Sequence, residues 1–136
     1  MTGIVIIGAG HAAGQAAASL RQAKFEGPIT IIGDEAHAPY QRPPLSKQYL
    51  AGTQLADKVY LRAEKFYADK DIQLMLDTRA TQIDPSTKTI NLDNGETIAY
   101  EKLLISTGSR PRKLSIEGSD LSGIHYLRTM DDVDGI

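Results

Sequence analysis

The sequence predicts an α/β fold with a parallel β-sheet and an antiparallel β-meander inserted before the last strand of that sheet. Two short apolar runs, IVII at 4–7 and ITII at 29–32, are typical of buried parallel strands. A helical pattern of apolar residues separates them. Farther along the chain, Asn94 and Gly95 stand between alternating apolar residues, which is a strong hairpin signal.

The first of these elements predict a βαβ unit. Within 11–24 the apolar residues are spaced by three and four, as expected of a helix that packs one face against a core. The residues on this face are Ala12, Ala13, Ala16, Ala17 and Leu20. A strand, a helix and a strand within about 30 residues form a βαβ unit, whose crossover is almost always right-handed.

The segment APYQRPPLSKQYL, at 38–50, follows the second strand. Pro43 and Pro44 fix φ near about −65° and push the preceding residues toward extended conformations. We therefore expect a stiff strap that continues neither helix nor strand. Ser46 is a suitable N-cap for a short helix that ends near Gly52, and this places Lys47 in the first helical turn.

The remaining elements complete the predicted sheet. They are a helix at 63–70, a strand at 72–76, short strands within 79–84 and 88–100, and a last buried strand at 103–106. Regular patterns fade after Arg110. We therefore expect the chain to be part of a longer protein, with 1–110 as the N-terminal part of a nucleotide-binding domain and 111–136 as a linker toward a further domain.

Composition excludes several classes of function. The chain has 136 residues, 15 basic and 17 acidic, and its net charge of −2 gives no reason to expect a nucleic-acid partner. Its apolar runs are far shorter than the roughly 20 residues needed to span a bilayer, so we expect no membrane span and a cytoplasmic location. There is no cysteine, which excludes disulfides, thiolate metal ligands and a dithiol redox centre in this chain. No metal site is predicted.

The turn after the first strand carries the dinucleotide fingerprint of a Rossmann-like fold, Gly8-x-Gly10-x-x-Ala13. Gly8 allows the tight turn, Gly10 lets a pyrophosphate approach the backbone, and the small Ala13 lets helix and strand pack closely. The helix N-terminus adds unpaired N–H groups and a partial positive charge. The context of strand, turn and helix therefore predicts a nucleotide site.

Two acidic residues follow at the end of the second strand. Asp34 and Glu35 lie about 20 residues after Ala13, where an acid hydrogen-bonds the adenosine ribose. A carboxylate at this place would repel a 2′-phosphate. Either acid could take this role, and the βαβ unit alone does not distinguish NAD from FAD.

Four segments together resemble a known family. They are VIIGAGHAAGQAAASLR, GDEAHAPYQRPPLSKQYLAG, LRAEKFYADKDIQLML and LLISTGSRPRKL. They are similar to the N-terminal part of the FAD-dependent ferredoxin reductases of the putidaredoxin reductase and biphenyl dioxygenase reductase type. These proteins are flavoproteins with two dinucleotide-binding domains, in the pyridine nucleotide-disulfide oxidoreductase superfamily. The resemblance extends over nearly the whole chain and implies a truncated FAD-binding domain.

The resemblance also implies which residues contact the cofactor. It puts the FAD pyrophosphate over Gly8, Gly10 and the backbone around Ala12 and Ala13, with Asp34 or Glu35 on the ribose. Its further implied contacts are Arg42 and Lys47 toward the flavin end, Ala80 at the adenine through its backbone, Thr107 and Gly108 against the cofactor, and Arg128. Ser106 stands where alanine is commoner in the family.

The absence of cysteine separates this chain from the disulfide-reducing members of the superfamily. Those proteins carry a redox-active cysteine beside the flavin, whereas this chain has Ser46 and Lys47 in the comparable region. The family then implies hydride transfer from NADH to FAD, followed by transfer of single electrons to a [2Fe-2S] ferredoxin or a rubredoxin. We expect Lys47 to act as the catalytic residue by stabilising the anionic reduced flavin.

Two alternatives remain open. The chain could be the flavoprotein part of a nitrite reductase or of an NADH oxidase, which share these motifs. It could also be a non-catalytic, truncated nucleotide-binding fragment that self-associates through an exposed sheet edge or apolar surface. Because an NADH-binding fold is missing from the 136 residues, we expect them alone not to turn over NADH.

Overall fold

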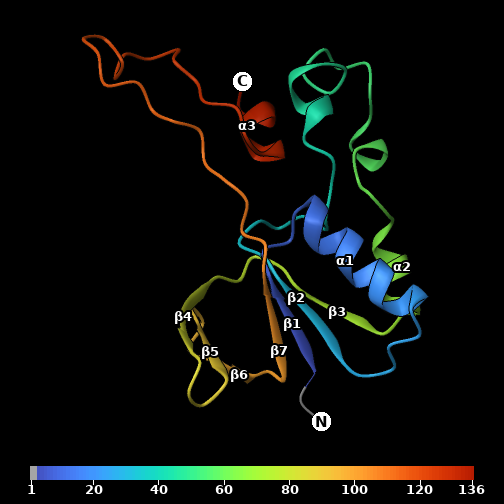
Figure 1. Cartoon of the computed structure of the whole chain (residues 1–136). Helices are drawn as coiled ribbons and strands as arrows, with labels where there is room; N and C mark the ends of the chain where they lie inside the picture. The colour runs from blue at the N-terminus through green and yellow to red at the C-terminus, as the bar shows by residue number, and fades with distance from the viewer. Residues whose placement is uncertain (1–2) are drawn as a thin grey trace. The chain divides into compact units, whose positions relative to one another are not determined.

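A computed structural model describes residues 3–136 and shows two compact units (Figure 1). The first unit consists of the chain up to Tyr40 together with Tyr60–Gly108. The second consists of Gln41–Val59 and Ser109–Ile136.

The first unit is built on a four-stranded parallel sheet with the order β3-β2-β1-β7. The strands are β1 (Ile4–Ile7), β2 (Ile29–Ile32), β3 (Ile72–Met75) and β7 (Lys102–Ile105). In the register of the central pair, Ile7 lies opposite Ile32, and on the other side of β1 it lies opposite Ile105. The carboxyl ends of the strands therefore share one edge. This arrangement confirms the predicted Rossmann-like α/β fold.

A three-stranded antiparallel sheet forms the predicted meander. Its strands are β4 (Ala80–Asp84), β5 (Thr89–Leu92) and β6 (Thr97–Ala99), in that order. It packs on one side of the parallel sheet, where Val5 and Ile7 of β1 meet Ile90 and Leu92 of β5. The alternate residue Ile6 points to the opposite core. Figure 1 shows the meander in yellow beside the parallel sheet.

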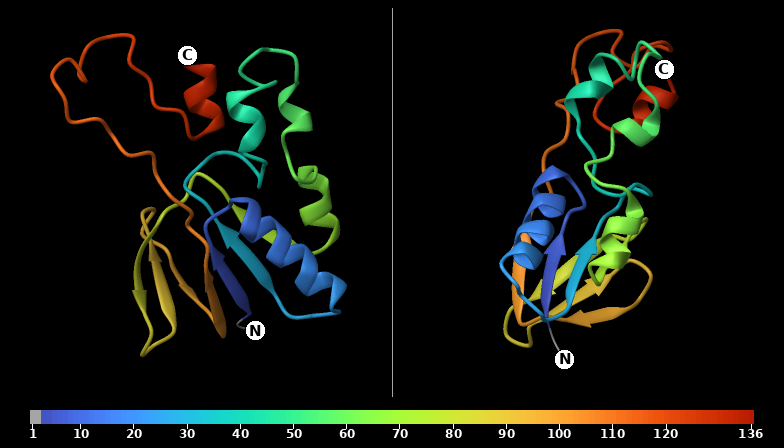
Figure 2. Two further views of the ribbon diagram at one scale, coloured as in Figure 1. Left: turned by 45° about the horizontal axis from the view of Figure 1, so that its top comes forward. Right: turned by 90° about the vertical axis from the view of Figure 1, so that its right-hand side faces the viewer.

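Two helices cover the other face of the parallel sheet. They are α1 (His11–Gln22) and α2 (Glu64–Asp69), shown in further views in Figure 2. The helix predicted at 11–24 ends two residues early. Ala13 and Ala17 are buried in the core with Ile6, as the apolar pattern predicted, but Ala12 is exposed and Gly14 is buried instead.

Arg21 fixes the end of α1 to two neighbouring turns. Its Nε donates to the carbonyl of Lys70 at 2.7 Å and its Nη2 to that of Asp71 at 2.7 Å. Its Nη1 donates to the carbonyls of Phe25 and Gly27 at 2.6 and 2.8 Å. One guanidinium thus joins the α1–β2 connection to the turn before β3.

The second unit contains three short helices, η1 (Pro43–Ser46), η2 (Ala56–Lys58) and α3 (Met130–Asp134). The prediction of a strap followed by a helix starting at Ser46 was wrong. The two prolines themselves begin the 3₁₀ helix η1, and Lys47 is its C-cap. The physical reason is that proline suits a first helical turn. Its fixed φ is compatible with a helix, and N–H groups in the first turn make no intrahelical hydrogen bond, so the missing N–H of proline costs none. Hydrogen-bonded turns follow up to Gly52.

Helix α3 was not predicted, and a capping box begins it. The Thr129 hydroxyl accepts a hydrogen bond from the Asp132 N–H at 3.1 Å, and the Asp132 carboxylate accepts one from the Thr129 N–H at 2.7 Å. In the same unit the Tyr49 hydroxyl donates to the Asp134 carboxylate at 2.8 Å. Among residues 3–136, no helix is long and apolar enough to cross a membrane.

Candidate functional site

The candidate site begins at the glycine turn between β1 and α1. Gly8 has φ +102°, and a Cβ placed on it would lie 2.2 Å from the carbonyl oxygen of Ser106. Its N–H donates to the carbonyl of Ile32 at 2.7 Å. The backbone conformation and the close approach of the chain after β7 therefore both require glycine here.

Gly10 differs, because the chain itself does not require a glycine at this position. Its φ is −87°, which any residue adopts, and a Cβ there would meet no atom within 4 Å. The space beside the Gly10 backbone is open as far as the described residues extend.

Gly10 is also the N-cap of α1, and no side chain of residues 3–136 caps this end of the helix. The first intrahelical bond runs from the Gly14 N–H to the Gly10 carbonyl at 3.1 Å. The N–H groups of the first turn therefore lack intrahelical partners, and they add to the positive end of the helix dipole. Ala12 in this turn is exposed, while Ala13 is fully buried against the sheet. An open, uncapped helix N-terminus of this kind fits a phosphate or pyrophosphate.

The end of β2 lies directly beside the glycine turn. A Cβ on Gly33 would lie 2.3 Å from the Cβ of Ala9. The backbone of this segment is held by the chain after β3, because the Asp77 N–H donates to the carbonyl of Glu35 at 3.0 Å. Asp34 and Glu35 are thereby placed at the same edge of the sheet as the helix N-terminus.

The two acids have different surroundings. The Asp34 carboxylate is exposed, and Nη2 of Arg79 is its ion-pair partner at 3.8 Å. Glu35 is half-buried and accepts a hydrogen bond from the hydroxyl of Tyr40. The contact between Tyr40 and Glu35 was not foreseen from the sequence, since no local pattern links a loop tyrosine to an acid five residues earlier.

The chain after β7 passes close to the glycine turn. The Ser106 N–H donates to the carbonyl of Ile7 at 2.8 Å, and Thr107 and Gly108 follow as exposed residues. Gly108 has φ +72°, a conformation that favours glycine. Ala80, the residue expected at the adenine, is half-buried at the start of the outer strand β4, and the pairing with β5 shifts register between Ala80 and Gln82.

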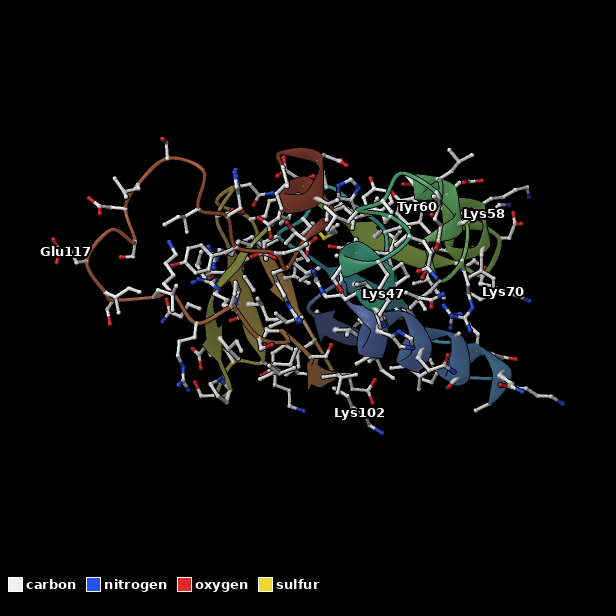
Figure 3. The ribbon with its side chains drawn as sticks, turned by 90° about the horizontal axis from the view of Figure 1, so that it is seen from above. Lys47, Lys58, Tyr60, Lys70, Lys102 and Glu117 are labelled. Atoms are coloured by element: carbon white, nitrogen blue, oxygen red, sulfur yellow. The ribbon has the colours of Figure 1, made fainter. Side chains whose placement is uncertain are left out.

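The other expected residues belong to the second unit. Nη1 of Arg42 donates to the carbonyl of Arg128 at 2.7 Å, so these two arginines are in direct contact. Nε of Arg128 is buried and has no hydrogen-bond partner among residues 3–136. Lys47 is exposed at the C-cap of η1, and its side chain is labelled in Figure 3.

Asp132 supplies the negative charge next to this arginine pair. Partial burial raises the pKa of its carboxyl, but hydrogen bonds from the Thr129 and Arg128 N–H groups and from the Thr129 hydroxyl lower it. The charge of Arg42 lowers it further, and the net pKa is below the usual value. Asp132 therefore stays ionised near neutral pH. The buried Nε of Arg128, which has no hydrogen-bond partner among residues 3–136, is a polar atom that an anionic group could satisfy.

The residues present thus fit a dinucleotide better than a metal ion. The first unit brings most of the predicted residues together at one edge of the parallel sheet: Gly8, Gly10, Ala12, Ala13, Asp34, Glu35, Thr107 and Gly108. Within residues 3–136 no cluster of three or more histidine, cysteine or acidic side chains could hold a metal.

Comparison with known proteins finds reductases that are similar to nearly the whole chain. The rubredoxin–NAD(+) reductase of Pseudomonas putida is 44% identical over 129 residues, which are 95% of this chain and 34% of the relative. The 3-phenylpropionate/cinnamic acid dioxygenase ferredoxin–NAD(+) reductase component of Photorhabdus laumondii is 45% identical over 128 residues, 94% of this chain and 32% of the relative. The chain thus spans about a third of the length of these curated relatives.

Solved structures give the same result and confirm the predicted family. A ferredoxin reductase from Rhodopseudomonas palustris has a TM-score of 0.92 at 42% identity, over 99% of this chain and 33% of its own. Putidaredoxin reductase in its covalent complex with putidaredoxin has a TM-score of 0.86 at 36% identity, over 98% of this chain and 33% of its own. The family model described as pyridine nucleotide-disulphide oxidoreductase matches residues 2–136. The chain therefore belongs to the pyridine nucleotide-disulphide oxidoreductase family.

Proposed function

We propose that the first unit binds FAD, with the pyrophosphate at the N-terminus of α1, and that the chain is the FAD-binding part of an NADH-dependent ferredoxin or rubredoxin reductase. The observation that carries the proposal is the open space at Gly10. Gly8 is required by the fold, but neither backbone conformation nor packing explains Gly10. The close approach of a ligand to the uncapped helix does explain it.

The acids and the relatives support the choice of cofactor. Carboxylates at Asp34 and Glu35 suit a ribose whose 2′-hydroxyl carries no phosphate. The relatives named above are reductases that act with NAD(+), and the chain matches about a third of each. Their names favour a ferredoxin or rubredoxin reductase over the nitrite reductase and NADH oxidase alternatives.

When bound, the flavin would accept a hydride and deliver single electrons to a [2Fe-2S] ferredoxin or a rubredoxin. In that chemistry the residues of this chain would bind and orient the cofactor and supply charge near it. The first turn of α1 would hold the pyrophosphate, and Glu35 or Asp34 the ribose. Lys47 would supply a positive charge for the reduced flavin. With no cysteine in the chain, its own residues offer no thiol to carry the electrons.

Several further predictions go with this function. Residues 1–110 would form the FAD-binding part, and 111–136 would lead to an NAD-binding domain. A cytoplasmic location also stays a prediction.

Self-association of the isolated chain would involve the edge strand β7, where Leu104 and Ile105 are 38% and 60% exposed.

The cofactor proposal is tested by titrating FAD into the purified chain and following flavin fluorescence, for wild type, Gly10→Ala and Gly135→Ala. Gly135 is the matched control, because its φ is −84° and a Cβ there would be 3.4 Å from its nearest neighbour. We expect Gly10→Ala to fold like wild type and to bind FAD at least about tenfold more weakly, which is about 1.4 kcal/mol. Equal FAD affinity of wild type and Gly10→Ala, or no binding by wild type, would contradict the proposal.

The electron-transfer proposal needs the full-length parent. We expect it to oxidise NADH in a reaction that depends on added ferredoxin or rubredoxin, and we expect the 136-residue chain to show no such turnover. Steady NADH oxidation by the isolated chain would show that this reaction does not need the rest of the parent protein.

A further inference from the structure

We propose that Tyr49 and Asp134 are positioning residues, and that the hydrogen bond between their side chains holds in place the segment that carries Lys47. The inference rests on the charge effect of Lys47 given in the proposed function, and it adds how that lysine is kept in position. Neither residue belongs to the nucleotide site described above, and no sequence pattern linked one to the other.

Two hydrogen bonds fasten the segment around Lys47 to the C-terminal part of the chain. Before Lys47 in the sequence, Nη1 of Arg42 donates to the carbonyl of Arg128 at 2.7 Å. After it, the hydroxyl of Tyr49 donates to Oδ1 of Asp134 at 2.8 Å. The bonded residues are 86 and 85 positions apart, so both bonds join distant parts of the sequence within the second unit. Lys47 therefore lies on a short stretch that is held on both sides.

The backbone between these two bonds consists of hydrogen-bonded turns. The N–H groups of Lys47 and Tyr49 both donate to the carbonyl of Pro44, each at 3.0 Å. The Ala51 N–H donates to the carbonyl of Lys47 at 2.9 Å. Leu45, within η1, is fully buried, whereas Lys47 itself is exposed. Because Lys47 and Tyr49 share an acceptor in these turns, a fixed Tyr49 side chain limits the movement of the Lys47 backbone.

Helix α3 supplies the other partner of the bond. It packs against η1, and Figure 2 shows the two short helices, red and teal, beside each other. Met130 and Val133 of α3 are buried. Asp134 is the last residue of this helix, where the helix dipole disfavours a negative charge. The helix itself therefore gives no reason for an acid at this position, whereas a hydrogen bond from Tyr49 to an ionised carboxylate does.

Hydrogen exchange of the chain, read by mass spectrometry over residues 44–54, measures how tightly this segment is held. We expect Tyr49→Phe and Asp134→Ala each to speed exchange of the protected amides about three- to tenfold, as expected for the loss of one hydrogen bond. Tyr126→Phe is the matched control. The Tyr126 hydroxyl accepts a hydrogen bond from the Leu114 N–H at 2.8 Å in the same unit, so this variant should leave exchange over 44–54 unchanged.

A double variant separates one bond between the two side chains from two unrelated effects. We expect Tyr49→Phe combined with Asp134→Ala to exchange as fast as either single variant, because both substitutions remove the same hydrogen bond. Accelerations that multiply in the double variant would show that the two residues act independently and would overturn the proposal. Wild-type exchange over 44–54 in Tyr49→Phe would also overturn it.

The flavin potential of the full-length flavoprotein shows whether the bond acts through Lys47. We expect Tyr49→Phe to make the potential more negative, as Lys47→Met should, but by a smaller amount, since the charge is loosened rather than removed. In the Lys47→Met background, Tyr49→Phe should change the potential no further. A purely structural role of Tyr49 would leave the potential unchanged, or would shift it equally with and without Lys47. Either result would overturn the proposal.

The outcomes also separate this inference from the proposed function. A shifted potential in Lys47→Met, together with wild-type potential and exchange in Tyr49→Phe, overturns the inference and leaves the charge effect of Lys47 standing. A wild-type potential in Lys47→Met removes that charge effect, and the positioning of Lys47 for the flavin is overturned with it. The exchange experiment needs no FAD, so it decides the bond between Tyr49 and Asp134 whether or not the chain binds the cofactor.

Discussion

Replacing Gly8 by alanine tests the distinction between the two glycines of the turn. An L-residue at the φ of +102° found here is strained by about 1–2 kcal/mol. The new Cβ would also lie 2.2 Å from the backbone carbonyl of Ser106, and overpacking of this kind costs about 1–3 kcal/mol. Gly8→Ala should therefore lower the free energy of unfolding by about 2–5 kcal/mol, out of the roughly 5–15 kcal/mol that a domain possesses.

The assay is urea unfolding followed by far-UV circular dichroism, with Gly10→Ala as the control. Because a Cβ at Gly10 meets nothing within 4 Å, we expect the free energy of unfolding of that variant to change by no more than about 0.5 kcal/mol. A Gly8→Ala variant that loses less than about 1 kcal/mol would show that the fold does not require glycine at this position, and an equally large loss in Gly10→Ala would show that the two glycines do not differ.

Three further predictions concern single side chains. Arg21→Lys cannot reproduce the bonds that the guanidinium makes to four carbonyls, so urea unfolding should show a loss of about 1–3 kcal/mol; wild-type stability would contradict this role. Hydrogen bonds from Ser86 and Thr87 lower the pKa of Asp84 from 3.8 to about 2, so its contribution to stability is complete above about pH 5 and disappears as pH falls toward 2. An NMR titration of the Asp84 carboxyl with a midpoint near the ordinary value would disprove this. In the full-length flavoprotein, Lys47→Met should make the flavin potential more negative and slow its reduction by NADH, whereas wild-type potential and rate would exclude the proposed charge effect.

The sequence patterns that lie within a few consecutive residues predicted the fold well. The runs at 4–7 and 29–32 are continuous and apolar because parallel strands are buried on both faces, and both are strands in the structure. Asn94 and Gly95 predicted the hairpin between β5 and β6, where Gly95 has φ +87°. In each case the signal and its cause lie within a few consecutive residues.

The elements that were missed depend on weaker or longer-range signals. Pro43 and Pro44 are compatible with an extended strap and with a first helical turn. The structure has the helical turn, and Leu45 within it is buried. Helix α3 has five residues, so only its Thr129-x-x-Asp132 capping box could have predicted it. The contact of Tyr40 with Glu35 depends on the packing of Pro39 on Gly14, which a pattern of hydrophobicity does not contain.

Amide chemical shifts report where on the chain the nucleotide binds. A ¹⁵N-labelled chain titrated with ADP should show its largest N–H shifts in the first turn of α1, at His11, Ala12 and Ala13, because these donors would bind the pyrophosphate. Smaller shifts are expected at Glu35. Saturable shifts confined to other parts of the chain, or no shifts in the first turn of α1 at saturating ADP, would show that the nucleotide does not bind at this helix N-terminus.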